Sequence, residues 1–190
     1  MGLRSLMPYM GIIAAVVAWI VILISIWVNP WFIFTRNAFS DLGGPSARYP
    51  WIYNYGLMLT AALVLIFSIH LIQYSRNKLE TVGASFISIA AIFLAMIGVF
   101  HEGTYPHVFV STWFFAQFDL AIIIWGLGSA MMGSKEGWGE FLMGLASPIP
   151  AVLIRWPSAA TLEAYGIIII DIFTVIVTCS EHASNRSTPH

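Results

Sequence analysis

The chain has 190 residues, of which 59% are hydrophobic and only 9% are charged, and its mean hydropathy is +0.84. A soluble domain of this length has too little interior to hide so much apolar surface, whereas a lipid bilayer accommodates it. The formal net charge of −1 at pH 7 argues against a nucleic-acid partner, because phosphates require a basic surface. A single cysteine, Cys179, excludes an intrachain disulfide. We therefore expect an integral membrane protein whose partners include membrane lipids and no nucleic acid.

The first apolar segment, residues 9–28, is expected to be a membrane helix. A bilayer is crossed by about 20 predominantly apolar residues, with a range of roughly 17–25. The segment is too long for the core of a signal peptide, and no clean small-x-small cleavage motif closes it. The hydrocarbon interior offers no water to backbone N–H and C=O groups. A spanning segment must therefore satisfy its own backbone groups, as a helix does, or belong to a closed β-barrel. The alternating pattern of barrel strands is absent, so we expect helices.

The connection after this segment, residues 29–51, is long and apolar. Loops above about 12–15 residues are most often functional or disordered. This one carries four consecutive apolar residues, Trp-Phe-Ile-Phe at 31–34, which disfavour a freely solvated loop. We expect it to lie on the membrane surface or to fold over the helix bundle.

The motif Ser-Asp-Leu-Gly-Gly-Pro within this connection allows two interpretations. In the first, Ser40 or Asp41 caps a turn through its side chain, while Gly43 and Gly44 supply unusual backbone angles before the proline. In the second, the Asp41 carboxylate is a polar ligand that reaches toward the hinge after the third apolar segment. The two interpretations are compatible.

That hinge, His-Glu-Gly-Thr-Tyr-Pro-His at 101–107, lies between two long apolar runs. His101, Glu102 and His107 are a large share of the ionisable side chains in a chain with so few charges. Any chemistry is therefore expected here first. The alternative is that each histidine merely hydrogen-bonds to a loop carbonyl or a lipid phosphate.

A metal site is one possible use of the hinge. His101, Glu102 and His107, joined by Asp41, would offer imidazole and carboxylate ligands that suit zinc, manganese or iron. The spacing differs from His-Glu-x-x-His, in which both histidines share one helix face, so convergence is not enforced. We expect no cofactor, and a divalent metal is the alternative.

The later segments complete an all-α fold, a polytopic transmembrane bundle of about six spans in one domain, residues 1–190. One long outer loop joins its first two helices. The fifth segment is short and contains Pro148 and Pro150, so a tilted or re-entrant helix is also compatible with it. The six predicted spans are residues 9–28, 52–74, 82–100, 108–132, 138–154 and 162–179.

Two acids lie deep within predicted spans. Asp119 and Asp171 are each roughly 13–17 Å from the outer ends of their helices, at about 1.5 Å per residue. A charged Asp at a helix centre costs about 2.5–3.5 kcal/mol, so each must face protein, water or a partner. If the two acids meet near the midplane, they would share a proton and form a relay. Otherwise each hydrogen-bonds across helices, with Ser129, Thr174 or Thr178 as candidate partners.

Four further residues carry structural predictions. His70 and Glu140 fall near the predicted inner interface, where long polar side chains extend to water, so we predict that both are solvated. Gly98 and Gly126 lie within spans, where small residues let two helices approach closely.

The placement of Lys and Arg predicts orientation, because cytoplasmic loops carry an excess of both. An even number of spans puts the two termini on one side. We therefore expect a multi-pass protein of the cell membrane with cytoplasmic N and C termini and an outward-facing hinge. Five basic residues lie on the side of the termini and three on the other: Arg4, Arg76, Lys78, Lys135 and Arg186 against Arg36, Arg48 and Arg155.

Three stretches occur in order along the chain: NAFSDLGG at 37–44, NYGLMLTAALVLIF at 54–67 and GVFHEGTYPHVFVSTWFF at 98–115. On these stretches the chain resembles a prokaryotic family of six-span integral membrane proteins known only as domain of unknown function 998. The resemblance implies a membrane fold and a polar face, but no established reaction. The family often has a proline where this chain has His101, so nothing is carried over to that residue. The recurrent polar positions of the family would correspond to Ser40, Asp41, Gly43, Glu102 and His107.

Three classes of function fit these observations. The first is a non-catalytic membrane protein, either an accessory subunit of a membrane assembly or a lipid-binding module, favoured by the small size of the chain. The second is an outer-leaflet hydrolase that acts on a lipid headgroup, with Asp41, Glu102 and His107 as ligands or acid–base groups. The third is a proton-coupled carrier that uses Asp119 and Asp171, although no inverted repeat is visible. We favour the first class and keep the hydrolase as the alternative.

Overall fold

The computed structural model of the chain describes residues 6–187, with side chains described for residues 6–183. Of the basic residues used to predict orientation, Arg4 and the side chain of Arg186 lie outside this part. The described residues contain helices and no strand, which confirms the all-α class. The elements are η1 (Met7–Tyr9), α2 (Met10–Val28), η2 (Phe39–Gly43), α3 (Pro50–Tyr74), α4 (Lys78–Val99), α5 (His107–Met131), α6 (Lys135–Ala146), α7 (Pro148–Leu153) and α8 (Ala159–Ser187).

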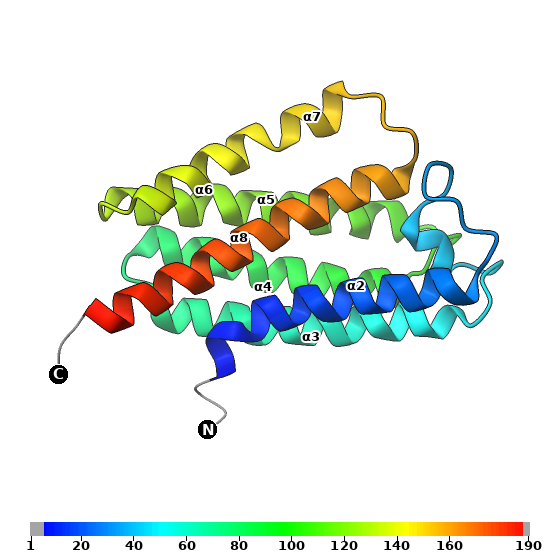
Figure 1. The fold of residues 1–190 in the computed structure, drawn as a ribbon, viewed down its shortest axis with the longest axis horizontal. Coiled ribbons are helices and arrows are strands. Elements are labelled where there is room, and N and C mark those ends of the chain that lie inside the picture. Colours follow the sequence, from blue (N-terminus) through cyan, green and yellow to red (C-terminus); the bar gives the residue numbers. More distant parts are fainter. Residues whose placement is uncertain (1–5, 188–190) are drawn as a thin grey trace.

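Five helical segments are long and apolar enough to cross a membrane, which indicates a multi-pass membrane protein. They correspond to the first four predicted spans and the last. The segment predicted as a fifth span, 138–154, is instead two short helices, α6 and α7, that meet at Ser147. Pro148 explains the break, because proline lacks an N–H donor and its ring clashes with the preceding helical turn. The first of them, α6, packs against α5, whereas α7 diverges from α5 and leads toward the beginning of α8 (Figure 1).

The connections divide between the two ends of the bundle (Figure 1). At one end, called the His107 end below, lie the α2–α3, α4–α5 and α7–α8 connections. At the other, called the Arg76 end, lie the α3–α4 and α5–α6 turns, the beginning of α2 and the end of α8. Consecutive long helices are therefore antiparallel neighbours, as short turns require.

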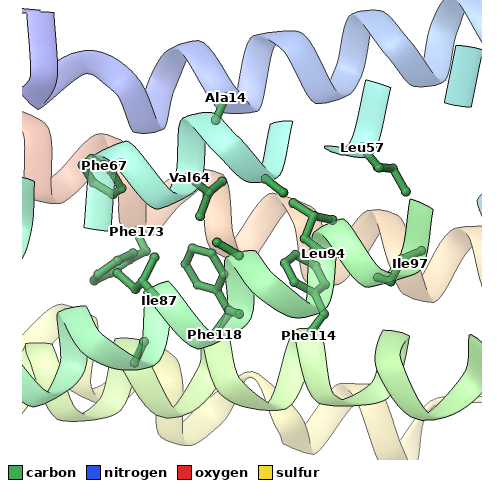
Figure 2. Close-up of a cluster of buried hydrophobic side chains, with 14 of the residues drawn as sticks. Ala14, Leu57, Val64, Phe67, Ile87, Leu94, Ile97, Phe114, Phe118 and Phe173 are labelled. Carbon is green, nitrogen blue, oxygen red and sulfur yellow. The ribbon is translucent and has the colours of Figure 1, made fainter. Parts of the chain in front are cut away.

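The packed interior lies between α2, α3, α4, α5 and α8 (Figure 2). In lipid the hydrophobic effect does not drive helices together, so close packing and interhelical hydrogen bonds hold the bundle. A Cβ atom at Gly98 would collide with the Asn54 carbonyl oxygen on α3, and one at Gly126 would collide with the Phe141 backbone nitrogen on α6. Both glycines therefore allow two backbones to touch, which confirms the packing role predicted for them.

The long connection between α2 and α3 folds over the His107 end of the bundle, as predicted. Its η2 turn packs against α3 and α8, and Phe39 and Leu42 are buried. Asn29 joins the two ends of the connection, because its side-chain Oδ1 accepts from the Arg48 backbone N–H at 2.6 Å and its Nδ2 donates to the Ser25 carbonyl at 2.8 Å. The connection is thus an ordered cap and not a solvated loop.

Candidate functional site

His107 and Glu102 form the polar centre of the His107 end. The His107 Nδ1 lies 2.8 Å from the Phe100 carbonyl oxygen, and its Nε2 lies 3.0 Å from Oε2 of Glu102. A carbonyl oxygen only accepts hydrogen bonds, so Nδ1 carries a proton. The imidazole and the Glu102 carboxyl group therefore lie within direct reach of each other at the beginning of α5.

Two consecutive turns of the hinge bring these side chains together. The Thr104 backbone N–H donates to the His101 carbonyl at 3.1 Å, and the His107 N–H donates to the Thr104 carbonyl at 3.2 Å. Gly103 has φ of +91°, a left-handed conformation that glycine adopts without steric cost. Glu102 is therefore turned back toward the start of α5.

Ser40 and Asp41 of η2 have different roles. Oδ2 of Asp41 accepts hydrogen bonds from the Ala38 backbone N–H at 2.9 Å and from Nδ2 of Asn37 at 3.1 Å. This arrangement confirms the turn-capping interpretation for Asp41. The Ser40 hydroxyl instead donates to Oε2 of Glu102 at 3.4 Å, a long contact that brings η2 to the hinge.

Glu163 also belongs to this group, although sequence reasoning did not single it out. Its Oε2 accepts a 2.7 Å hydrogen bond from the Phe39 backbone N–H, so it fastens η2 to the beginning of α8. The available signal was the same one that drew attention to Asp119 and Asp171, a carboxylate inside an apolar run. We call Ser40, Glu102, His107 and Glu163 the mouth cluster.

A narrow cavity begins at this cluster and runs into the bundle. Its volume is about 90 Å³ and it is predominantly apolar. Tyr53 and Phe67 both line it, so it extends roughly 20 Å along α3 at about 1.5 Å per residue. We call this cavity the slot. Besides Ser40, His107 and Glu163 of the mouth cluster and Phe39 of η2, its lining includes Gly11, Ala14, Ala15, Ala18 and Ile22 of α2, Tyr53, Leu57, Thr60, Val64 and Phe67 of α3, Leu94 and Ile97 of α4, Ser111, Phe114, Phe115 and Phe118 of α5, and Ile167, Ile170, Asp171 and Thr174 of α8.

The two deep acids have separate hydrogen-bond partners. The Trp19 Nε1 donates to Oδ2 of Asp171 at 2.8 Å, and the Ser147 hydroxyl donates to Oδ1 of Asp119 at 2.6 Å. Asp171 therefore links α8 to α2 beside the slot, whereas Asp119 links α5 to the break between α6 and α7. Neither acid uses the partners expected from the sequence, and the arrangement resembles interhelical bonding more than a shared-proton pair.

His101 takes no part in the mouth cluster. Its Nδ1 lies 2.9 Å from the backbone carbonyl oxygen of Glu102. Within the part of the chain whose side chains are described, no three His, Cys, Asp or Glu residues come together in a group that could hold a metal ion. The set of His101, Glu102 and His107 thus does not assemble as three ligands.

The Arg76 end holds a second polar cluster that the sequence did not reveal. Glu80 is fully buried. Its Oε1 accepts hydrogen bonds from Nη2 of Arg76 at 2.6 Å and from the Ser129 hydroxyl at 3.0 Å. The hydrogen bond to Glu80 raises the pKa of the Arg76 guanidinium above its usual value.

The prediction that His70 and Glu140 are solvated was wrong. Glu140 is 2% exposed, and the mostly buried His70 side chain lies 2.8 Å from Glu181.

Comparison with known proteins identifies the family without supplying a function. No curated protein and no solved structure matches the chain. One family model does, that of the family described as "Protein of unknown function (DUF998)", and it covers residues 12–180. Since this match includes all the helices from α2 to most of α8, the chain belongs to that family.

Proposed function

We propose that this protein binds a membrane amphiphile, with the apolar chain of the ligand in the slot and its polar headgroup at the mouth cluster. The observation that carries the proposal is the continuity of the two regions. An elongated apolar cavity inside a membrane bundle ends at a group of polar side chains, three of them ionisable. Binding sites combine an apolar wall with a few polar groups in this way.

The chemistry of the mouth cluster favours a headgroup that donates hydrogen bonds. Glu102 and Glu163 are carboxylates, and no Lys or Arg lines the described slot. A phosphate would find no cationic partner among these residues, whereas a hydroxyl or amine would find acceptors. The expected ligand is therefore a lipid whose headgroup carries hydroxyl or amino groups.

Entry of the ligand would take place between α2 and α8. These helices contact each other much less than α4 contacts α3 and α5. The slot is too narrow in this arrangement for a complete acyl chain, so α8 must separate from α2 when the slot is filled. The bond between Trp19 and Asp171 crosses this seam.

We also infer six membrane crossings, with α6 and α7 together forming the fifth. The support is that α6 and α7 together lead from the Arg76 end to the His107 end (Figure 1), and that α2 begins and α8 ends at the same end of the bundle. The orientation predicted from the sequence, five basic residues on the side of the termini against three, would place the Arg76 end in the cytoplasm. The mouth cluster would then take its headgroup from the outer leaflet.

Native mass spectrometry after mild extraction from the membrane tests the proposal. The unaltered protein should carry a lipid of defined mass. Ala18→Phe places a ring in the slot and should remove that mass, while Val16→Phe, on the exposed face of the same helix, should keep it. A lipid that survives Ala18→Phe would contradict binding in the slot. Additional polypeptide mass would instead favour an accessory subunit of a membrane assembly.

A hydrolase acting on the same headgroup is the second candidate. The observation in its favour is the 3.0 Å distance between Nε2 of His107 and Oε2 of Glu102, because an imidazole beside a carboxyl group suits general acid–base catalysis. Ser40 contacts Glu102 and not His107 among the described side chains, so a water molecule is the better nucleophile. Release of headgroup from an identified bound lipid, lost in Glu102→Gln, would show turnover. A lipid that stays intact in the unaltered protein would contradict it.

A further inference from the structure

A second cavity lies at the Arg76 end, at the opposite end of the bundle from the mouth cluster. Its volume is about 280 Å³, and it lies between the end of α3, the α5–α6 turn and the last turns of α8. Its wall combines carboxylates with aromatic rings and one arginine. The lining residues that matter here are Tyr74, Arg76, Trp125, Glu136, Glu140 and Glu181.

Two of the charged groups in this wall already have partners. The Arg76 guanidinium lies 2.6 Å from Oε1 of Glu80, behind the cavity, and the Arg76 backbone N–H also donates to Oε2 of Glu80 at 2.6 Å. Glu181 lies 2.8 Å from Nε2 of His70. Arg76 is therefore paired with the carboxylate of Glu80, and Glu181 with the imidazole of His70.

Glu140 is different. It is 2% exposed, and among the described residues no hydrogen bond or ion pair to its carboxyl group is found. A buried carboxylate without a partner is strongly unfavourable, so such groups are normally paired, protonated or in contact with a ligand. Since Glu140 lines the cavity, its open side is the cavity itself.

The size and lining of the cavity indicate which ligand would balance this charge. A single water occupies about 30 Å³, so the space is larger than a bare inorganic ion needs. Trp125 and Tyr74 add aromatic surface, which attracts organic cations through the electrons of their rings. We propose that the cavity at the Arg76 end binds a small organic cation, whose ammonium group contacts the Glu140 carboxylate.

Isothermal titration calorimetry on the purified protein in detergent tests this inference, with butylammonium and tetramethylammonium as probes. Potassium and magnesium chloride at matched ionic strength are the inorganic comparisons. We expect saturable binding of at least one ammonium probe, weakened at least roughly tenfold by Glu140→Gln. Gly139→Ala is the control, because it changes the position next to Glu140 on α6, has nothing within 4 Å of the added atom and should leave binding unchanged.

Each other outcome would overturn the inference. Absence of saturable ammonium binding to the unaltered protein, unchanged affinity in Glu140→Gln, or tighter binding of potassium or magnesium would each do so. If Glu140→Gln does not fold, Ser180→Phe serves in its place, because it fills the cavity from α8 without altering the carboxylate. Loss of ammonium binding in Ser180→Phe supports the inference, and retained binding overturns it.

Discussion

The Trp19 indole donates a hydrogen bond to the Asp171 carboxylate at 2.8 Å, and this bond joins α2 to α8, the first and last long helices. Both side chains are partly buried beside the slot. The bond satisfies an acid within a membrane helix and crosses the seam between two helices that contact each other sparsely. It therefore contributes both to stability and to closure of the slot.

Trp19→Phe should destabilise the protein by about 1–3 kcal/mol, because it leaves the Asp171 carboxyl group without its donor. Chemical or thermal unfolding in detergent measures the loss. Trp27→Phe is the control on the same helix, since Trp27 is 81% exposed. Equal stability of the two variants would show that the bond contributes nothing.

Asp41→Ala should cost about 0.5–2 kcal/mol by removing the acceptor that caps η2. Asp41→Asn keeps a side-chain oxygen and should lose less. Limited proteolysis within residues 29–49 would report loosening of the cap. Equal protection of the alanine and asparagine variants would argue that the carboxylate has a role other than capping.

Gly126→Ala should destabilise by about 1–3 kcal/mol, because the added methyl group meets the backbone of α6. Gly139→Ala, on α6 itself, has nothing within 4 Å of the new atom and should be neutral or slightly stabilising. Unfolding of both variants in the same detergent gives the comparison. A tolerant Gly126→Ala would mean that α5 and α6 separate easily.

Arg76→Ala should cost about 3–5 kcal/mol, because it leaves the fully buried Glu80 carboxylate without its cation. Adding Glu80→Gln should restore a large part of the loss. A double-mutant cycle on unfolding free energies measures the coupling. Simple additivity of the two changes would show that the ion pair is energetically unimportant.

The inferred orientation predicts thiol labelling from outside the cell. In a Cys179→Ser background, Ser46→Cys in the exposed α2–α3 connection should react with a membrane-impermeant maleimide on intact cells. Met132→Cys, in the α5–α6 turn at the other end, should react only after permeabilisation. The reverse pattern would place the mouth cluster in the cytoplasm.

Sequence reasoning found the long helices because hydropathy and length are properties of consecutive residues. It found the cap at Asp41 because such caps are local. It did not find Glu163, the pairing of Arg76 with Glu80, or the partners of Asp119 and Asp171. These depend on how each helix is rotated about its axis. Helices that are apolar all round carry no stripe to indicate that rotation.

The interruption at Ser147 has a consequence for how the bundle moves. The Tyr165 hydroxyl on α8 donates to the Ser147 carbonyl at 2.9 Å, and the Trp156 Nε1 donates to the Pro150 carbonyl at 3.2 Å. The carbonyl that loses its usual donor, because Pro148 has no N–H, is that of Gly144, and it accepts the Ser147 hydroxyl at 3.3 Å. The Tyr165 bond ties this break to α8. A shift of α8 away from α2 would therefore pull on α7 as well. In the proposed opening of the slot, the break at Ser147 would let α7 follow α8 while α6 stays packed against α5.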